Sequence, residues 1–227
     1  MHLLRGDNGM IYINNKNVHL ALYNKDLIVL DKGKDDFYVF NDVADQLNEN
    51  SNPVGEAVSS FLNSLYPESQ INQVSFDTTS DYVEIRWLRP NIENKNKFMH
   101  VPYLPFIYLL LYSVKSTVDN HGFTGAEILL NQARKNKRLN NRLLRLIPEK
   151  TFIQSLNSCF VMFEIKNPCL IYSLMLAIYF SSRNKNSTLI VGVRTQPFFS
   201  HAWLEIDGEI FLEDTSLRNK LSVIMEI

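Results

Sequence analysis

Asn167-Pro168-Cys169-Leu170, followed by Val191-Gly192-Val193-Arg194 and then by Ser200-His201-Ala202-Trp203-Leu204-Glu205, is the stretch of sequence that decides the fold of this chain. It predicts a cysteine at the start of an apolar helix, then a buried strand, then a histidine that opens a second strand. Rigid elements of this kind hold a thiolate nucleophile and an imidazole base at a defined separation. The pattern therefore favours a cysteine-histidine active site.

Cys169 is predicted to lie in the first turn of its helix. Asn167 is a favourable N-cap residue, and Pro168 is favoured at the first helical position. Free backbone N–H groups and the positive end of the helix dipole stabilise a thiolate at this place. The apolar run 170–180 predicts a central, buried helix. The other cysteine, Cys159, lies in a short apolar segment that we interpret as a core strand.

Two strands are predicted after this helix. The run 188–193 is short and apolar, and a polar loop then leads to His201. Because side chains alternate along a strand, His201, Trp203 and Glu205 are expected on one face of the sheet. The histidine thus begins a row of side chains that share one surface.

A carboxylate is expected beside the histidine, and two residues compete for this role. Asp207-Gly208 predicts a tight hairpin turn. A two-residue turn places Asp214 directly opposite His201, whereas a three-residue turn with a bulge places Glu213 there. Either carboxylate can orient the imidazole as the third group of a catalytic triad. The hairpin geometry favours Asp214.

The N-terminal part of the chain predicts a small separate module. Three short strands are expected at 18–23, 27–30 and 37–40, bounded by turn residues. Two helices follow, one running to about Leu47 and one opening at Pro53 with an apolar stripe. This order is typical of a winged-helix-type module. A DNA-binding role is an alternative, but the second helix carries no basic residue to meet phosphates, so no nucleic-acid partner is expected.

We interpret residues 76–97, which are polar and poorly periodic, as a linker between a module of residues 1–75 and a second domain of residues 98–227. The second domain is expected to open with an apolar helix over 104–118 and to continue with a helix over 125–134. The most apolar part of the first helix is shorter than the about 20 residues that span a bilayer. It is therefore predicted to be a core helix rather than an integral membrane segment.

Composition excludes several classes of protein. The chain of 227 residues is 45% hydrophobic, enough for a substantial core, and its 23 basic and 24 acidic residues nearly balance. Two cysteines make neither a disulfide framework nor a metal quartet, and no His-x-x-x-His or Cys-x-x-Cys spacing predicts a metal. No phosphate-binding loop motif is present. The start of the chain lacks an apolar signal region, so a reducing cytoplasm is expected.

The cysteine and histidine motifs, with Gly-Val-Arg-Thr-Gln-Pro-Phe at 192–198, resemble the lasso-peptide biosynthesis B proteins. The likeness is greatest to the leader peptidases that mature microcin-type lasso peptides, and it extends to the ending 220–227. It is strong from Cys169 to the C-terminus and rests on domain order upstream. The resemblance implies an α+β chain, with a winged-helix-like (PqqD-like) recognition module followed by a transglutaminase-like, papain-like cysteine protease domain.

The resemblance also implies roles for particular residues. The family's catalytic cysteine and histidine correspond to Cys169 and His201. Its aspartate lies twelve residues after the histidine, where this chain has Glu213, so family spacing favours Glu213 while hairpin geometry favours Asp214. The leader is expected to add as a strand to the edge of the first module, opposite a helix wall. The residues predicted to bind it are Phe37, Tyr38, Val39, Phe40, Val58, Phe61 and Leu62.

The function implied by the resemblance is that of a cytoplasmic leader peptidase. It would bind the leader of a precursor peptide, cleave it from the core peptide, and pass the core to a lasso cyclase of asparagine-synthetase type. ATP dependence has been associated with the family, although no motif in this sequence explains it. Two alternatives remain, a transglutaminase-like acyltransferase that uses the same side chains and a non-catalytic precursor-binding scaffold. The intact Cys169 and His201 argue against the scaffold.

Overall fold

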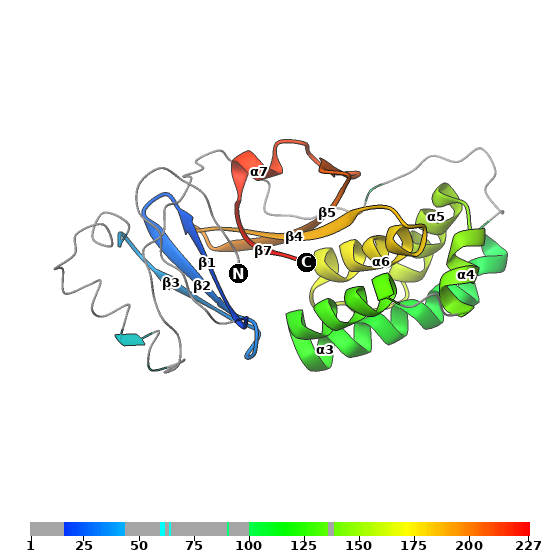
Figure 1. Ribbon diagram of the computed structural model, residues 1–227, viewed down its shortest axis with the longest axis horizontal. Helices are drawn as coiled ribbons and strands as arrows, with labels where there is room; N and C mark the ends of the chain where they lie inside the picture. The colour runs from blue at the N-terminus through cyan, green and yellow to red at the C-terminus, as the bar shows by residue number, and fades with distance from the viewer. Residues whose placement is uncertain (1–15, 44–59, 62–63, 65–89, 91–99, 136–138) are drawn as a thin grey trace. The chain divides into compact units, whose positions relative to one another are not determined.

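The computed structural model describes residues 16–43, 60, 61, 64, 90, 100–135 and 139–227 (Figure 1). The chain divides into two compact units. Unit 1 comprises residues 1–83, 192–200 and 216–225, and unit 2 comprises residues 84–191, 201–215 and 226–227. Helices and strands are both present, as the α+β prediction requires. The expected boundaries of the linker lie outside the described residues and stay a prediction.

Unit 1 contains an antiparallel sheet with strand order β1-β2-β3 (Figure 1). Its strands are β1 (Val18–Tyr23), β2 (Asp26–Asp31) and β3 (Asp36–Phe40). The three strands predicted from the sequence are therefore confirmed. β2 is buried throughout, whereas β3 lies at an edge of the sheet and is half-buried or exposed along its length.

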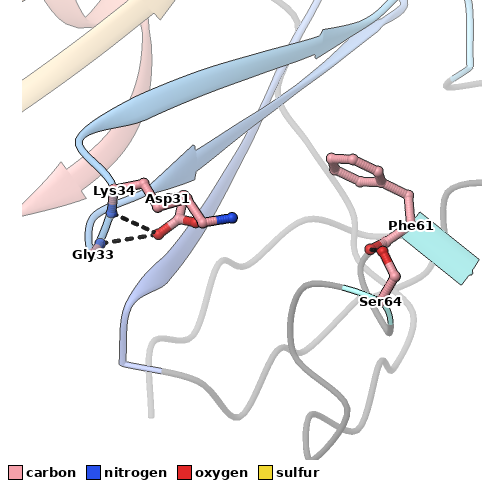
Figure 2. Close-up of polar contacts among 5 residues, drawn as sticks. All are labelled: Asp31, Gly33, Lys34, Phe61 and Ser64. Atoms are coloured by element: carbon pink, nitrogen blue, oxygen red, sulfur yellow. Dashed lines mark hydrogen bonds and ion pairs between the residues drawn. The ribbon is translucent and has the colours of Figure 1, made fainter.

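Turn chemistry explains the two hairpins of this sheet. Asn24 begins the two-residue turn between β1 and β2 with a φ of 54°, a left-handed conformation that asparagine tolerates. In the turn between β2 and β3, Asp31 Oδ1 accepts hydrogen bonds of 3.0 Å from the backbone N–H groups of Gly33 and Lys34 (Figure 2). The aspartate thereby satisfies two donors that the turn would otherwise leave unpaired.

Only part of the two predicted helices of the first module is described. Ser60, Phe61 and Ser64 are helical, and Ser64 Oγ donates a hydrogen bond of 2.7 Å to the carbonyl of Phe61 (Figure 2). The ring of Phe61 lies 5.2 Å, between centroids, from the rings of both Tyr38 and Phe40 on β3. The rest of both predicted helices, with Val58 and Leu62, lies outside the described residues.

Unit 2 is built around helices, with α6 at their centre. The helices are η1 (Val101–Tyr103), α3 (Leu104–Lys135), α4 (Leu139–Leu146), α5 (Glu149–Phe160) and α6 (Pro168–Ser182). α3 packs against both α5 and α6 (Figure 1). Every residue of α6 from Leu170 to Ser182 is buried, which confirms the predicted central helix.

α3 joins the two helices that were predicted in this region. Gly122 interrupts it with a φ of 52° and a ψ of −137°, a conformation that favours glycine. Among the described helices, α3 is long and apolar enough to cross a membrane by length and composition alone. Its positions Ile107, Leu111, Val114 and Val118 form one buried stripe, so this face belongs to the core of unit 2.

The setting of Cys159 differs from the prediction. It lies in the last turn of α5 and not in a strand, and the chain turns directly afterwards at Val161 and Met162, which are mostly exposed. A short apolar run fits a buried strand and a buried helix end equally well, so periodicity could not distinguish them. The interpretation of Cys159 as a core residue does not depend on this difference, because the side chain is 1% exposed.

The C-terminal part of the chain forms a sheet with strand order β6-β5-β4-β7. Its elements are β4 (Ser187–Arg194), β5 (Phe199–Ile206), β6 (Glu209–Ile210), α7 (Leu217–Lys220) and β7 (Ser222–Glu226). Asp207 and Gly208 form the two-residue turn between β5 and β6, with φ values of 53° and 87°. The predicted hairpin is therefore confirmed.

We expect the substitution Gly125→Ala to destabilise the protein, although alanine normally stabilises a helix relative to glycine. A Cβ atom at Gly125 would lie 2.7 Å from the carbonyl oxygen of Thr117, which is backbone and cannot rotate away. Urea denaturation followed by circular dichroism should show a loss of about 1–3 kcal/mol. Gly33→Ala is the comparison and should destabilise less, because its nearest neighbour is the side-chain oxygen of Asp31 at 3.3 Å, which can shift by a few tenths of an ångström. An increase in stability for Gly125→Ala would contradict this account.

Candidate active site

Three side chains of unit 2 lie together. Cys169 is the second residue of α6, His201 lies on β5, and Glu213 follows β6. His201 Nε2 lies 2.5 Å from Glu213 Oε2. The Cys169 side chain lies near enough to His201 to raise the pKa of the imidazole. Because Glu213 engages Nε2, the ring nitrogen that remains for the sulfur is Nδ1. The imidazole therefore lies between a thiol and a carboxylate, as a base between its nucleophile and its orienting group does.

The start of α6 positions the thiol. Pro168 occupies the beginning of the helix as predicted, and the first helical hydrogen bond runs from Ile171 N–H to the Asn167 carbonyl at 3.1 Å. The Asn167 side chain makes no capping hydrogen bond, which differs from the expectation that it would act as an N-cap. The N–H groups of this first turn have no partner within the helix. Cys169 is half-buried beside them.

The two cysteines have different environments. The Cys159 sulfur lies 3.6 Å from the carbonyl oxygen of Leu104, and the side chain is buried between helices. Burial raises the pKa of the Cys159 thiol, which favours the neutral, unreactive form. Cys169 instead faces an imidazole at a helix start. The environments support Cys169, and not Cys159, as the nucleophile.

The protonation of His201 results from opposing effects. Burial by itself would lower the pKa of this histidine, because the imidazolium loses its hydration. Hydrogen bonds with Cys169 and Glu213, together with their negative charges, outweigh burial and raise the pKa from 6.5 to about 9. The raised pKa favours the protonated imidazole at neutral pH.

Glu213, and not Asp214, is the carboxylate that contacts His201 Nε2. The strand register that would place Asp214 opposite His201 does not continue that far along the chain. The hairpin turn has two residues, as that argument assumes, but β6 ends at Ile210. Leu212 then adopts a left-handed φ of 61°, which breaks the alternation that a continuing strand would have. Glu213 takes the place that a regular strand would have given to Asp214. The separation of twelve residues expected from family spacing is the one observed.

The predicted row of side chains on β5 is confirmed. The rings of His201 and Trp203 are stacked with an interplanar angle of 21° and centroids 6.2 Å apart. Trp203 Nε1 donates a hydrogen bond of 2.9 Å to Glu205 Oε1. All three residues are at most 5% exposed. The row therefore continues from the imidazole into the interior of unit 2.

Sequence reasoning missed Ser173, which joins the two elements that carry the site. Ser173 lies one helical turn after Cys169, and its hydroxyl donates a buried hydrogen bond of 3.0 Å to the carbonyl of Ala202, the residue after His201. This bond ties the helix that carries Cys169 to the strand that carries His201. A single serine inside the apolar run Leu170–Ala177 was the available signal, but its partner is 29 residues away.

The predicted leader-binding strand is β3. Its alternate residues face opposite sides, since Tyr38 and Phe40 meet Phe61 while the ring of Phe37 lies 5.3 Å from that of Phe198. Val39 is partly exposed. At the other edge of this sheet, Ser222 Oγ donates a hydrogen bond to the Leu22 carbonyl on β1. Val58 and Leu62 lie outside the described residues, so their part in the predicted groove stays a prediction.

In the described part of the chain, no group of three or more His, Cys, Asp or Glu side chains is arranged to hold a metal ion. Residues 109–226, which include Cys169, His201 and Glu213, match the family model of the transglutaminase-like superfamily. The microcin J25-processing protein McjB of Escherichia coli is 32% identical over 214 residues, which cover 92% of this chain and 98% of McjB. No solved structure gives a significant match.

We expect Glu213→Gln to lower the pKa of His201 from about 9 towards the ordinary value of 6.5. The amide keeps the shape of the side chain but removes the negative charge that stabilises the imidazolium. A pH titration of the His201 imidazole by NMR measures the change. Asp214→Asn is the matched control and should leave the titration close to that of the unaltered protein. If Asp214→Asn produced the larger shift, the assignment of Glu213 would be wrong.

Proposed function

Because this chain belongs to the transglutaminase-like superfamily and to the lasso-peptide biosynthesis B proteins, we propose that it is a leader peptidase. It binds the leader of a ribosomally made precursor and cleaves it from the core peptide with a cysteine nucleophile. The single observation that carries this proposal is the grouping of Cys169, His201 and Glu213 within one unit of the fold, with His201 Nε2 hydrogen-bonded to Glu213. The name of McjB, which describes processing of a microcin, supports the choice of substrate.

In the proposed mechanism, His201 takes the proton of Cys169 and forms a thiolate–imidazolium pair. The thiolate attacks the carbonyl carbon of the peptide bond between leader and core. As that bond breaks, the imidazolium protonates the departing amine of the core peptide, leaving the leader as a thioester on Cys169. His201 then removes a proton from water, which hydrolyses the thioester and releases the leader with the free thiol.

The other groups of the site stabilise charge during these steps. Glu213 holds His201 through Nε2, which directs Nδ1 towards the sulfur and favours the imidazolium. The unpaired N–H groups at the start of α6, including that of Cys169, are donors for the developing oxyanion. The half-buried position of Cys169 leaves its sulfur partly accessible to a peptide.

The same three side chains would also serve an acyltransferase, which differs only in the acceptor of the acyl group. Incubation of enzyme and precursor with a labelled amine separates the two activities, because a peptidase releases a free leader carboxylate. A non-catalytic scaffold would support processing by another protein without using its own thiol.

The proposal also includes transfer of the core to a lasso cyclase, ATP dependence and a cytoplasmic location. A cleavage assay with and without ATP tests the ATP dependence.

We propose that leader recognition belongs to β3 in unit 1. An edge strand offers backbone N–H and C=O groups to an added strand, which gives affinity without sequence specificity. The aromatic side chains Tyr38, Phe40 and Phe61 form an apolar surface beside that edge, which suits apolar side chains of a leader. β3 is the less buried outer strand of this sheet, and this supports the assignment.

We expect Cys169→Ala to slow cleavage of the precursor roughly 10³-fold or more, because it removes the nucleophile. Mass spectrometry of leader and core products over time measures the rate, and circular dichroism checks that the variant is folded. Cys159→Ala is the matched control and should cleave at a rate within about threefold of the unaltered protein, since its thiol is buried in the core. Normal cleavage by Cys169→Ala would rule out the mechanism and favour the scaffold.

We expect Tyr38→Ala to weaken leader binding by about tenfold, or about 1.4 kcal/mol. The substitution removes one of the two rings in the contact between Tyr38 and Phe61 beside the β3 edge. Fluorescence anisotropy with a labelled leader peptide measures the affinity, in the full chain carrying Cys169→Ala to prevent cleavage. Leu109→Ala is the control, since this residue is a large exposed apolar side chain on α3 of unit 2. Equal losses for both variants, or no loss for Tyr38→Ala, would argue against β3 as the leader-binding strand.

A further inference from the structure

Glu205 is a buried carboxylate on the active-site face of β5 that the proposed mechanism does not use. It is 4% exposed, and its Oε1 accepts the hydrogen bond from Trp203 Nε1. Placing a carboxylate in the interior costs free energy that an apolar side chain would avoid. The side chain it bonds is itself fully buried next to the catalytic imidazole. Its position therefore points to a role in the site.

The positions of Trp203 and Glu205 show how they can restrict the orientation of the imidazole. Glu213 holds His201 at Nε2, on the edge of the ring, and this contact leaves the ring free to tilt about it. The indole of Trp203, the next side chain on this face of β5, is nearly parallel to the imidazole, with an interplanar angle of 21° and ring centroids 6.2 Å apart, and it is the neighbour that a tilting imidazole would meet. An indole can also rotate, and the 2.9 Å hydrogen bond to Glu205 prevents it from doing so.

We propose that Trp203, held by its hydrogen bond to Glu205, is a positioning residue that keeps the His201 imidazole in the plane required to pair with the Cys169 sulfur. This inference rests on the proposed function and deepens it. Among the described residues, the titratable groups next to the imidazole include Cys169 from α6 and Glu213 from the segment after β6, and Glu205 from β5 itself bonds to the neighbouring indole.

The test measures the thiolate–imidazolium pair directly, without a peptide substrate. The rate of alkylation by iodoacetamide is followed at the Cys169 peptide by mass spectrometry, which separates it from Cys159, and is compared between pH 6 and pH 10. A paired thiolate reacts at pH 6, whereas an unpaired thiol reacts only when it ionises at high pH. The ratio of the two rates therefore reports the pairing, and a residue that only stabilises the fold leaves this ratio unchanged.

Three variants separate the hydrogen bond from the charge: Glu205→Leu and Glu205→Gln are near-isosteric, and Trp203→Phe keeps an aromatic ring without the N–H donor. Glu205→Leu and Trp203→Phe each remove the hydrogen bond, and we expect the ratio of the pH 6 rate to the pH 10 rate to fall at least about tenfold in both. Glu205→Gln keeps an oxygen acceptor, and its ratio should stay within about twofold of the unaltered protein. In the double variant Trp203→Phe/Glu205→Leu, the rate ratio should fall no further than in either single variant. The two single variants and the double variant all remove the same hydrogen bond between Trp203 and Glu205.

Two outcomes would overturn the inference, and they differ from each other. If Glu205→Leu and Trp203→Phe lower the melting temperature but keep the rate ratio, the pair is a core contact without a positioning role. If the unaltered protein shows no rapid alkylation of Cys169 at pH 6, the thiolate–imidazolium pair itself is absent. The second result would also remove the proposed peptidase mechanism, whereas the first would leave it intact.

Discussion

The candidate site depends on one buried imidazole that lies between a thiol and a carboxylate. His201 is protected from water, which by itself disfavours its charged form, yet the thiol of Cys169 and the carboxylate of Glu213 reverse that effect and raise its pKa to about 9. A histidine in this state can stabilise a thiolate at neutral pH. Loss of either partner removes part of what opposes burial and therefore lowers the pKa of the ring.

Placing the Cys169 thiol beside the His201 imidazole requires α6 and β5 to keep a fixed position relative to each other. α6 brings the thiol and β5 brings the imidazole, and each is buried along most of its length. The hydrogen bond from Ser173 to the Ala202 carbonyl joins them within one residue of His201 and one helical turn of Cys169. Because interior side chains are close-packed, this polar contact in an apolar setting defines how the two elements meet.

In the proposed function, one unit cleaves the precursor and the other binds its leader. Unit 2 contains the three groups that perform the chemistry, and its core comes from α3, α5 and α6. Unit 1 contains β3, an outer strand flanked by aromatic side chains and suited to binding an extended peptide. Recognition by an edge strand tolerates variation in the bound sequence, whereas cleavage requires a defined geometry. Separate sets of residues can therefore meet the two requirements.

The sequence by itself determined the local elements, including the strands of the first sheet, the helix that begins at Pro168 and the hairpin at Asp207-Gly208. Each depends on periodicity or on the backbone preferences of adjacent residues, which are present in any short window. The family resemblance also predicted Cys169 and His201 as the catalytic pair. Only the tertiary structure decided that Glu213 lies against the imidazole, because Leu212 takes a left-handed conformation that no strand pattern predicts. It likewise decided that Cys159 ends a helix and that Ser173 bonds to Ala202, since these outcomes depend on packing between segments far apart in the chain.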